Sequence, residues 1–173
     1  MQLLGTLPEA HAKIWADTQQ LITLIAGLAS RDVGSLDVGI SLLRSIREES
    51  YEELNQIQHE HLILVAAEWL VAEKRCPPDT LWYWNPRQTG DSSEPDLRGC
   101  VDATVLVSAE VTTSKAPIGT IDKRMAGTLS KLAKMEGQLY YFVRSTAMHK
   151  RAQTKITKAQ WRIEAIELVV TET

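Results

Sequence analysis

The sequence has few cysteines and no long apolar run, and both absences narrow the classes of protein to which it can belong. Its 173 residues include only two cysteines, Cys76 and Cys100, which form no C-x-x-C pair and have no cluster of histidines nearby. We therefore expect neither a disulfide framework nor a zinc site, and free thiols suit a reducing compartment. No stretch approaches the roughly 18 uninterrupted apolar residues of a membrane span. No basic segment precedes the first apolar run, so a secretory signal is not expected either.

Acidic residues are scarce in one segment, residues 111–162. This segment contains eleven lysines and arginines but only two acids, Asp122 and Glu136. Residues 1–110 have the opposite bias, with eight basic and seventeen acidic side chains, so the small net charge of −3 conceals two oppositely charged parts. Such an asymmetry favours a face directed at a polyanion. The alternative is a pair of solvated helices whose lysines meet acidic helices from the first part.

The first 75 residues have the pattern of helices, because apolar residues recur at helical spacing and breakers separate the runs. The stretch Ser50-Tyr51-Glu52-Glu53 has the capping-box pattern of a helix N-terminus. The sequence predicts a helix from about Pro8 to Leu28, a short helix from Ser35 to about Arg47, and a long helix from Ser50 to about Arg75.

From residue 81 the pattern changes to short strands and two basic helices. The sequence predicts strands over about 81–84, 95–100, 104–113, 139–143 and 161–170, and helices over about 120–136 and 146–157. Thr120 and Thr146 are expected to cap the two helices, and Gly137 to follow the end of the first. Residues 86–93 are polar and turn-rich, which predicts a loop. We expect a single α/β domain, with a helical accessory layer over residues 1–48 and an α/β core over residues 50–170.

Two acidic residues stand on neighbouring predicted strands, at positions where they can meet. A turn near residue 102 makes the strands antiparallel, and Asp96 and Glu110 then come close if the register puts them on one face. Two carboxylates in such a place repel one another, and partial burial adds to the cost. A cation between them removes this cost, and carboxylate oxygens suit Mg²⁺. We therefore expect a magnesium site, which Mn²⁺ can also occupy.

This segment resembles the PD-(D/E)XK nuclease superfamily. The family motif is Pro-Asp, a spacer, an acidic residue, any residue and usually lysine; Pro95-Asp96 matches its first half and Glu110-Val111 the start of its second. The predicted order of elements over residues 50–143 also follows the family core of a helix, a three-stranded meander, a helix and a further strand. The resemblance implies a restriction-endonuclease-like mixed sheet flanked by helices, with an N-terminal helical layer. It also implies in-line hydrolysis of DNA phosphodiesters, with one or two Mg²⁺ ions held by Asp96 and Glu110.

Thr112 stands where the family usually carries a catalytic lysine. Threonine cannot act as a base, although its hydroxyl can hold a water molecule. Lys115 and Lys123 are the expected replacements for the lysine. Family members often carry a further acid on the helix before the meander, and Glu68 is the candidate here, with Glu60 as its rival. The alternative is a protein of the same fold that has lost activity and only binds DNA.

The basic helices are expected to contact DNA phosphates, which gives affinity without sequence readout. The expected contacts are Lys115, Lys123, Arg124, Lys131 and Lys134, and a second stripe comprises Lys150, Arg151, Lys155 and Lys158. The four histidines show no ligand spacing, and we interpret them as surface or packing residues: His11, His59, His61 and His149.

By analogy with double-strand cutters, which need two sites, the resemblance implies a homodimer formed through the N-terminal helices. It also suggests a cytoplasmic enzyme of prokaryotic or phage origin with no membrane partner. A protein-interaction subunit is the alternative from another class, motivated by the acidic first part of the chain.

Overall fold

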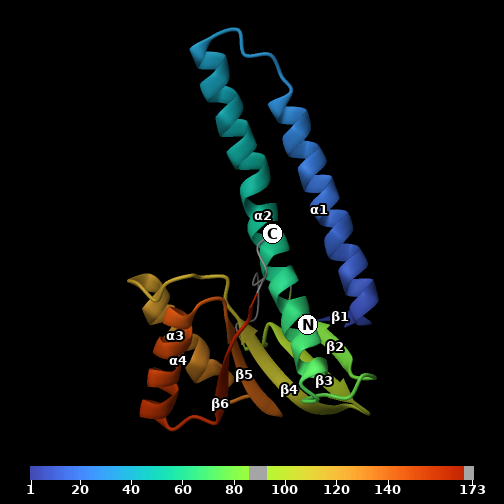
Figure 1. The fold of residues 1–173 in the computed structure, drawn as a ribbon, viewed down its shortest axis with the longest axis vertical. Coiled ribbons are helices and arrows are strands. Elements are labelled where there is room, and N and C mark those ends of the chain that lie inside the picture. Colours follow the sequence, from blue (N-terminus) through green and yellow to red (C-terminus); the bar gives the residue numbers. More distant parts are fainter. Residues whose placement is uncertain (86–92, 170–173) are drawn as a thin grey trace.

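The computed structural model describes residues 1–85 and 93–169, and these residues form an α/β fold of four helices and a six-stranded sheet (Figure 1). Residues 86–92 of the predicted loop lie outside the described residues. The strands are β1 (Gln2–Gly5), β2 (Leu81–Trp84), β3 (Leu97–Val101), β4 (Thr104–Val111), β5 (Gln138–Val143) and β6 (Ile163–Glu167). The helices are α1 (Leu7–Ala29), α2 (Leu36–Ala72), α3 (Thr120–Leu132) and α4 (Thr146–Ala159). The predicted α/β class is confirmed, and β1 is a strand that the sequence pattern did not predict.

The six strands lie in the sheet in the order in which they occur along the chain. The pairs from β1 to β4 are antiparallel, whereas β4, β5 and β6 are parallel. Parallel neighbours need a crossover connection, and α3 and α4 supply the two crossovers. The result is an open mixed sheet, with a meander on one side and two β-α-β units on the other.

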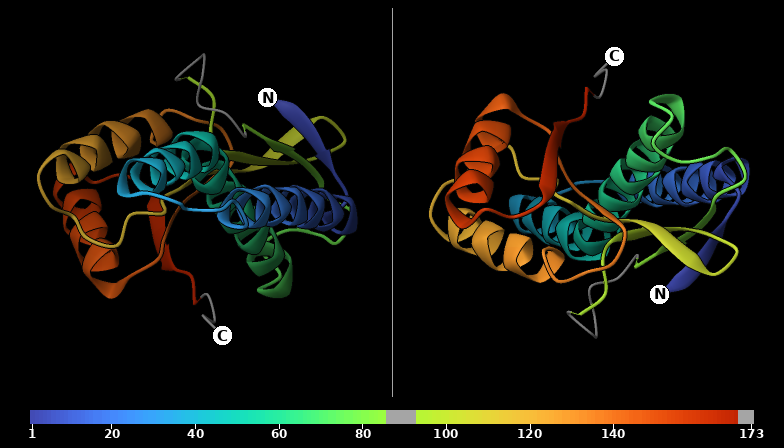
Figure 2. Two further views of the ribbon diagram at one scale, coloured as in Figure 1. Left: turned by 90° about the horizontal axis from the view of Figure 1, so that it is seen from above. Right: turned by 90° about the horizontal axis from the view of Figure 1, so that it is seen from below.

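The helices α1 and α2 cover one face of the sheet, and α3 and α4 cover the other face beside β4, β5 and β6 (Figure 2), so this part of the sheet has an apolar core on each side. Successive strand residues point to opposite faces, and β5 shows the consequence. Tyr140 and Phe142 join the core beneath α2, where both rings meet Trp69 edge-on, whereas Tyr141 and Val143 pack with α3 and α4. None of the described helices is both long enough and apolar enough to cross a membrane.

The helix α2 runs without a break through the boundary that the sequence predicts near residue 48. Ser35 caps its N-terminus, and the Ser35 hydroxyl accepts a hydrogen bond of 3.3 Å from the backbone N–H of Val38. Ser50 caps nothing: its hydroxyl donates to the carbonyl of Ile46 one turn earlier. The predicted end of a helix at Arg47 is therefore wrong. The α1–α2 pair instead forms one antiparallel hairpin that extends beyond the sheet (Figure 1).

Helix caps are the other places where the prediction was wrong. Gly119, not Thr120, occupies the N-cap of α3, and no side chain caps that end. Ser145, not Thr146, caps α4 and accepts a 3.2 Å hydrogen bond from the backbone N–H of Met148. Each error is a shift of one residue. The helices themselves are present, with ends that differ by a few residues from those predicted.

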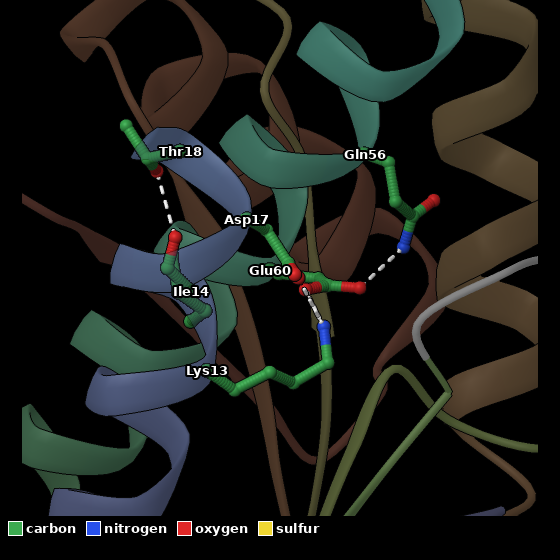
Figure 3. A network of polar contacts seen from close by, with 6 residues as sticks. All are labelled: Lys13, Ile14, Asp17, Thr18, Gln56 and Glu60. Carbon is green, nitrogen blue, oxygen red and sulfur yellow. Dashed lines mark hydrogen bonds and ion pairs between the residues drawn. The ribbon is translucent and has the colours of Figure 1, made fainter. Parts of the chain in front are cut away.

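A buried carboxylate joins α1 to α2 (Figure 3). Glu60 is 4% exposed and accepts hydrogen bonds from Lys13 Nζ at 2.8 Å and from Gln56 Nε2 at 3.0 Å. Lys13 also donates to Asp17 at 2.7 Å, and its Nζ lies 5.1 Å from the centre of the Trp84 ring. Glu60, the rival candidate for the further acid, is therefore directed at α1 and serves the contact between the two helices.

The turn from α3 into β5 requires glycine at position 137. Gly137 has a φ of +79°, and a Cβ there would lie 2.7 Å from the carbonyl carbon and oxygen of Leu106. Because both the conformation and the space are unfavourable, Gly137→Ala should lower the free energy of unfolding by roughly 2–5 kcal/mol in urea denaturation. Gly127→Ala is the matched control: a Cβ at that position in α3 meets nothing within 4 Å, so a gain of about 0.5–1 kcal/mol is expected. Equal effects of the two changes would contradict this account.

Candidate active site

The hairpin of β3 and β4 brings Asp96 and Glu110 together. Leu97 pairs with Ala109 in antiparallel register, so Asp96, one residue before β3, stands opposite Glu110. Residues that face each other across an antiparallel pair project from the same face of the sheet. Asp96 is 1% exposed and Glu110 is 2% exposed. The predicted antiparallel pairing is confirmed, and it leaves two facing carboxylates almost completely removed from water.

Asp96 is held by the backbone of β4 and by α2. The backbone N–H of Val111 donates to Asp96 Oδ2 at 2.9 Å, and Nε2 of His59 lies 3.5 Å from the same oxygen. Burial by itself lowers the pKa of His59, but its hydrogen bond and charge interaction with Asp96 raise that pKa above its ordinary value. The protonated form of His59 is therefore favoured beside the carboxylate.

Glu110 meets a lysine from α3. Nζ of Lys131 lies 2.5 Å from Glu110 Oε1 and also donates to the backbone carbonyl of Glu94 at 3.1 Å. The ammonium approaches Oε1 off the direction of a hydrogen bond, so this buried oxygen accepts no hydrogen bond from the described residues. Burial and the charge of Asp96 raise the pKa of Glu110 to about 8, although Lys131 and His59 act in the opposite direction.

A cavity of about 390 Å³ opens over Glu110, between α2 and α3. Glu52 and Gln56 line it from α2, Arg124 from α3, and Thr112 from the segment after β4. Its lining therefore combines carboxylates, an amide, a hydroxyl and a guanidinium, which are groups that bind a polar or charged ligand.

Tyr141 completes the cavity from the neighbouring strand, because it pairs with Glu110 across β4 and β5. Burial and the charge of Glu110 raise the pKa of Tyr141, so its phenol remains protonated and can donate a hydrogen bond. The Thr112 hydroxyl interacts with Tyr141 and accepts a 3.3 Å hydrogen bond from the backbone N–H of Ser114. Two hydroxyls thus stand beside the carboxylates.

The structure gathers only part of the catalytic set that the sequence predicts. Asp96, Glu110 and Thr112 lie together, at or directly beside the cavity. Lys115 is exposed on the segment after β4, and its backbone carbonyl accepts a hydrogen bond from Ser145. Glu68 is exposed on α2, beyond His59. Neither Lys115 nor Glu68 lines the cavity.

Only some of the residues predicted to contact DNA lie at the cavity. Arg124 lines the cavity, and Lys123 and Lys134 are exposed on or just after α3. Lys131 was predicted only as a phosphate contact, but its ammonium is directed inward to Glu110. The helix that was expected to present a basic stripe thus also supplies the cation of the carboxylate site.

Part of the second basic stripe is neutralised by an acidic residue of the neighbouring helix α3. Asp122 of α3 forms a two-pronged ion pair with Arg151, at 2.7 and 2.9 Å, and lies 3.1 Å from Lys155 Nζ. Hydrogen bonds from these two cations hold the pKa of Asp122 well below its ordinary value. The positive charge of α4 is therefore used partly to bind α4 to α3.

His59, interpreted from the sequence as a surface or packing residue, contacts Asp96 and lines the cavity, and the contribution of α2 to the cavity was not predicted. The three α2 side chains concerned, Glu52, Gln56 and His59, precede Asp96 by about forty residues. Their spacing of four and three places them on one side of a helix. That polar stripe was the available signal, but only the tertiary structure shows that it faces the carboxylates.

No family model, no curated protein and no solved structure matches this chain. Its function is therefore argued from the chemistry of the cavity. Among residues 1–85 and 93–169, no group of three or more histidine, cysteine, aspartate or glutamate side chains is arranged to hold a metal ion.

The raised pKa of Glu110 predicts a pH-dependent effect of Glu110→Gln on stability. The folded protein retains a proton on Glu110 that the unfolded chain loses near the ordinary value of 4.5, so this site destabilises the fold progressively from about pH 4.5 to about pH 8. Glutamine keeps the shape without the charge. The melting temperature of the variant, relative to the wild type, should therefore rise between pH 5 and pH 9 by at least about 4 °C in the presence of a chelator.

The exposed residue Glu68 provides the control for this measurement, because Glu68→Gln should give a difference from the wild type that does not change with pH. A difference for Glu110→Gln that stays constant from pH 5 to pH 9 would show that Glu110 is ionised normally in the folded protein.

Proposed function

We propose that this protein is a metal-dependent nuclease that hydrolyses DNA phosphodiesters, with Asp96 and Glu110 as metal ligands and Lys131 as the catalytic lysine. One observation carries the proposal: the buried Asp96–Glu110 pair lies beside Lys131 at an open polar cavity. Carboxylates with a raised pKa in a cavity are typical of functional sites, since burial and mutual repulsion disfavour them elsewhere.

The carboxylate pair fits Mg²⁺ or Mn²⁺, which prefer oxygen ligands. Glu110 Oε1 is buried and accepts no well-aligned hydrogen bond from the described residues, although the Lys131 ammonium lies 2.5 Å away, so this oxygen retains lone-pair capacity for a cation. A cation also offsets the repulsion that raises the pKa of Glu110. When bound, such a metal ion polarises a phosphate oxygen and lowers the pKa of a coordinated water.

The resembled family usually carries its catalytic lysine at the position of Thr112. In this protein Lys131 takes the role of that lysine. Its ammonium is beside Glu110, where it can neutralise charge that develops on a phosphate, and the Glu94 carbonyl helps to hold it there. Thr112 and Tyr141 provide hydroxyls that can orient water or a phosphate oxygen. This assignment replaces Lys115 and Lys123, the lysines first considered for this role.

The surroundings of the cavity support a nucleic-acid substrate. Arg124 lines the cavity, and the exposed Lys123 and Lys134 extend the positive charge beyond it. Such side chains bind a phosphate backbone without reading its sequence.

The order of elements supports a restriction-endonuclease-like fold. The helix α2 is followed by the meander β2–β3–β4, and then by α3 and β5. This is the order of the core of the resembled family, and the two acidic residues of its motif lie directly before β3 and near the end of β4, where they face each other.

Cleavage of plasmid, linear and branched DNA in Mg²⁺ or Mn²⁺ tests the proposal. Wild-type protein should cut; Glu110→Ala and Asp96→Asn should lower the cleavage rate by at least about 10³-fold, and Lys131→Ala by about 10²-fold. The matched controls Glu68→Ala and Arg31→Ala change exposed residues outside the cavity and should cut normally. No cutting on any substrate, with salt-sensitive DNA binding intact, would instead support an inactive binding protein.

Moving the lysine tests the role of Lys131 separately from that of the metal ligands. If Lys131 substitutes for a lysine at position 112, the double variant Lys131→Ala/Thr112→Lys should recover about tenfold of the cleavage lost in Lys131→Ala. Thr112→Lys alone should bring no gain, because a second ammonium beside Lys131 is repelled. Equal rates for Lys131→Ala and the double variant would indicate that Lys131 acts by another route, such as holding Glu110 in place.

A further inference from the structure

The α1–α2 hairpin exposes apolar side chains on the side that faces away from the sheet. One side of α2 packs on the sheet through buried residues such as Ile63, Ala67 and Leu70. At helical spacing, the opposite side of α2 carries four exposed apolar residues: Leu36, Ile40, Leu43 and Leu54. Leu36 is 80% exposed and Leu43 is 64% exposed. A surface helix normally turns its apolar side to the core, so this arrangement needs a reason.

The helix α1 contributes Trp15 and Ile22 to the same side. A groove of about 300 Å³ between the helices is lined by Trp15 from α1 and by His61 from α2, so these two sides are adjacent. Ile22 follows Trp15 by seven residues and therefore lies on the same side of α1. We call these six residues the outer face: Trp15, Ile22, Leu36, Ile40, Leu43 and Leu54.

The outer face is large enough for a protein interface. From Leu36 to Leu54 it extends about 27 Å along α2, at 1.5 Å per residue, and two adjacent helices of about 10 Å diameter make it roughly 20 Å wide. The flat area of about 500 Å² is of the same order as the roughly 800 Å² of accessible surface that each partner buries in a stable complex. The hairpin extends beyond the sheet at this point (Figure 1), so the sheet does not cover it.

We propose that the outer face binds the outer face of a second copy of this chain. Two hairpins that meet face to face about a two-fold axis form a four-helix bundle, which buries both apolar surfaces at once. The face itself is apolar, and two exposed arginines of α2, Arg44 and Arg47, stand beside it at helical spacing, so identical faces bring little like charge together. An anionic membrane surface is a poorer fit, since Asp37, Glu48 and Glu49 of α2 are exposed nearby and membrane-binding helices carry basic borders.

Such a dimer leaves both candidate active sites open. Glu52, Gln56 and His59 line the cavity or contact Asp96 from the side of α2 that faces the sheet, opposite the outer face. Self-association through the outer face therefore does not close the cavity. The inference rests on the exposed apolar surface and not on the proposed nuclease activity, so either can fail without the other.

The test is the mass of the full chain in solution, measured by sedimentation equilibrium from about 1 to 100 µM. The wild type should sediment at twice the chain mass of 19.3 kDa. Leu36→Glu/Leu43→Glu places two charges in each half of the interface and should weaken self-association by about 100-fold or more. Ile118→Glu is the control: Ile118 is 74% exposed but lies outside the hairpin, so this variant should remain a dimer.

A second variant on the other helix, Trp15→Ala/Ile22→Glu, keeps the test valid if the first variant does not fold, and it should also yield the single-chain mass. Circular dichroism of each variant identifies loss of folding. A wild type that sediments at the single-chain mass up to 100 µM would overturn the proposal. A dimer that persists in folded variants of the outer face would overturn it too.

Discussion

Two carboxylates that face one another out of water are the constraint on which the candidate site depends. The pairing of β3 with β4 places Asp96 opposite Glu110, and the helices α2 and α3 leave both side chains almost fully buried, with Glu110 at the floor of the cavity. Such a pair is costly unless positive charge or hydrogen-bond donors surround it. One hydrogen bond and two ion pairs surround it: the Val111 N–H donates from β4, and His59 from α2 and Lys131 from α3 supply positive charge. Burial and the remaining repulsion from Asp96 together raise the pKa of Glu110, and a bound metal ion would relieve the repulsion.

The layered fold explains why the site lies where it does. Alternate residues of the central strands enter two separate cores, so each face of the sheet has its own helices. At the end of β4 the chain leaves the sheet, and α2 from one layer and α3 from the other approach the same position. The cavity lies between these two helices, and residues of β4 and β5 form part of its lining. Many side chains in its lining are polar, because they come from the borders of the apolar sides of α2 and α3.

The helix α2 serves three surfaces, and this explains its length of 37 residues. One side packs on the sheet and lines the cavity, a second meets α1 through the buried Glu60–Lys13 pair, and a third is the outer face. A helix with three occupied sides lacks a simple amphipathic pattern, because apolar residues are spread around it. The same fact explains the false boundary near residue 48, where charged residues interrupt the apolar spacing although the helix continues.

Local physical rules were sufficient for much of the chain, and long-range packing decided the rest. Residue spacing alone determined the order of the elements from residue 81 onward, the antiparallel hairpin, and the two acidic residues that meet across it, because strand alternation and turns act over a few residues. Helix caps were misplaced by one residue, since neighbouring Ser, Thr and Gly residues compete for the same position. Only the tertiary structure decided that Lys131 pairs with Glu110, that His59 contacts Asp96, and that Glu60 is directed at α1. These contacts join residues from about 20 to 47 positions apart on separate elements, and the direction of a side chain across such a distance depends on how the layers pack.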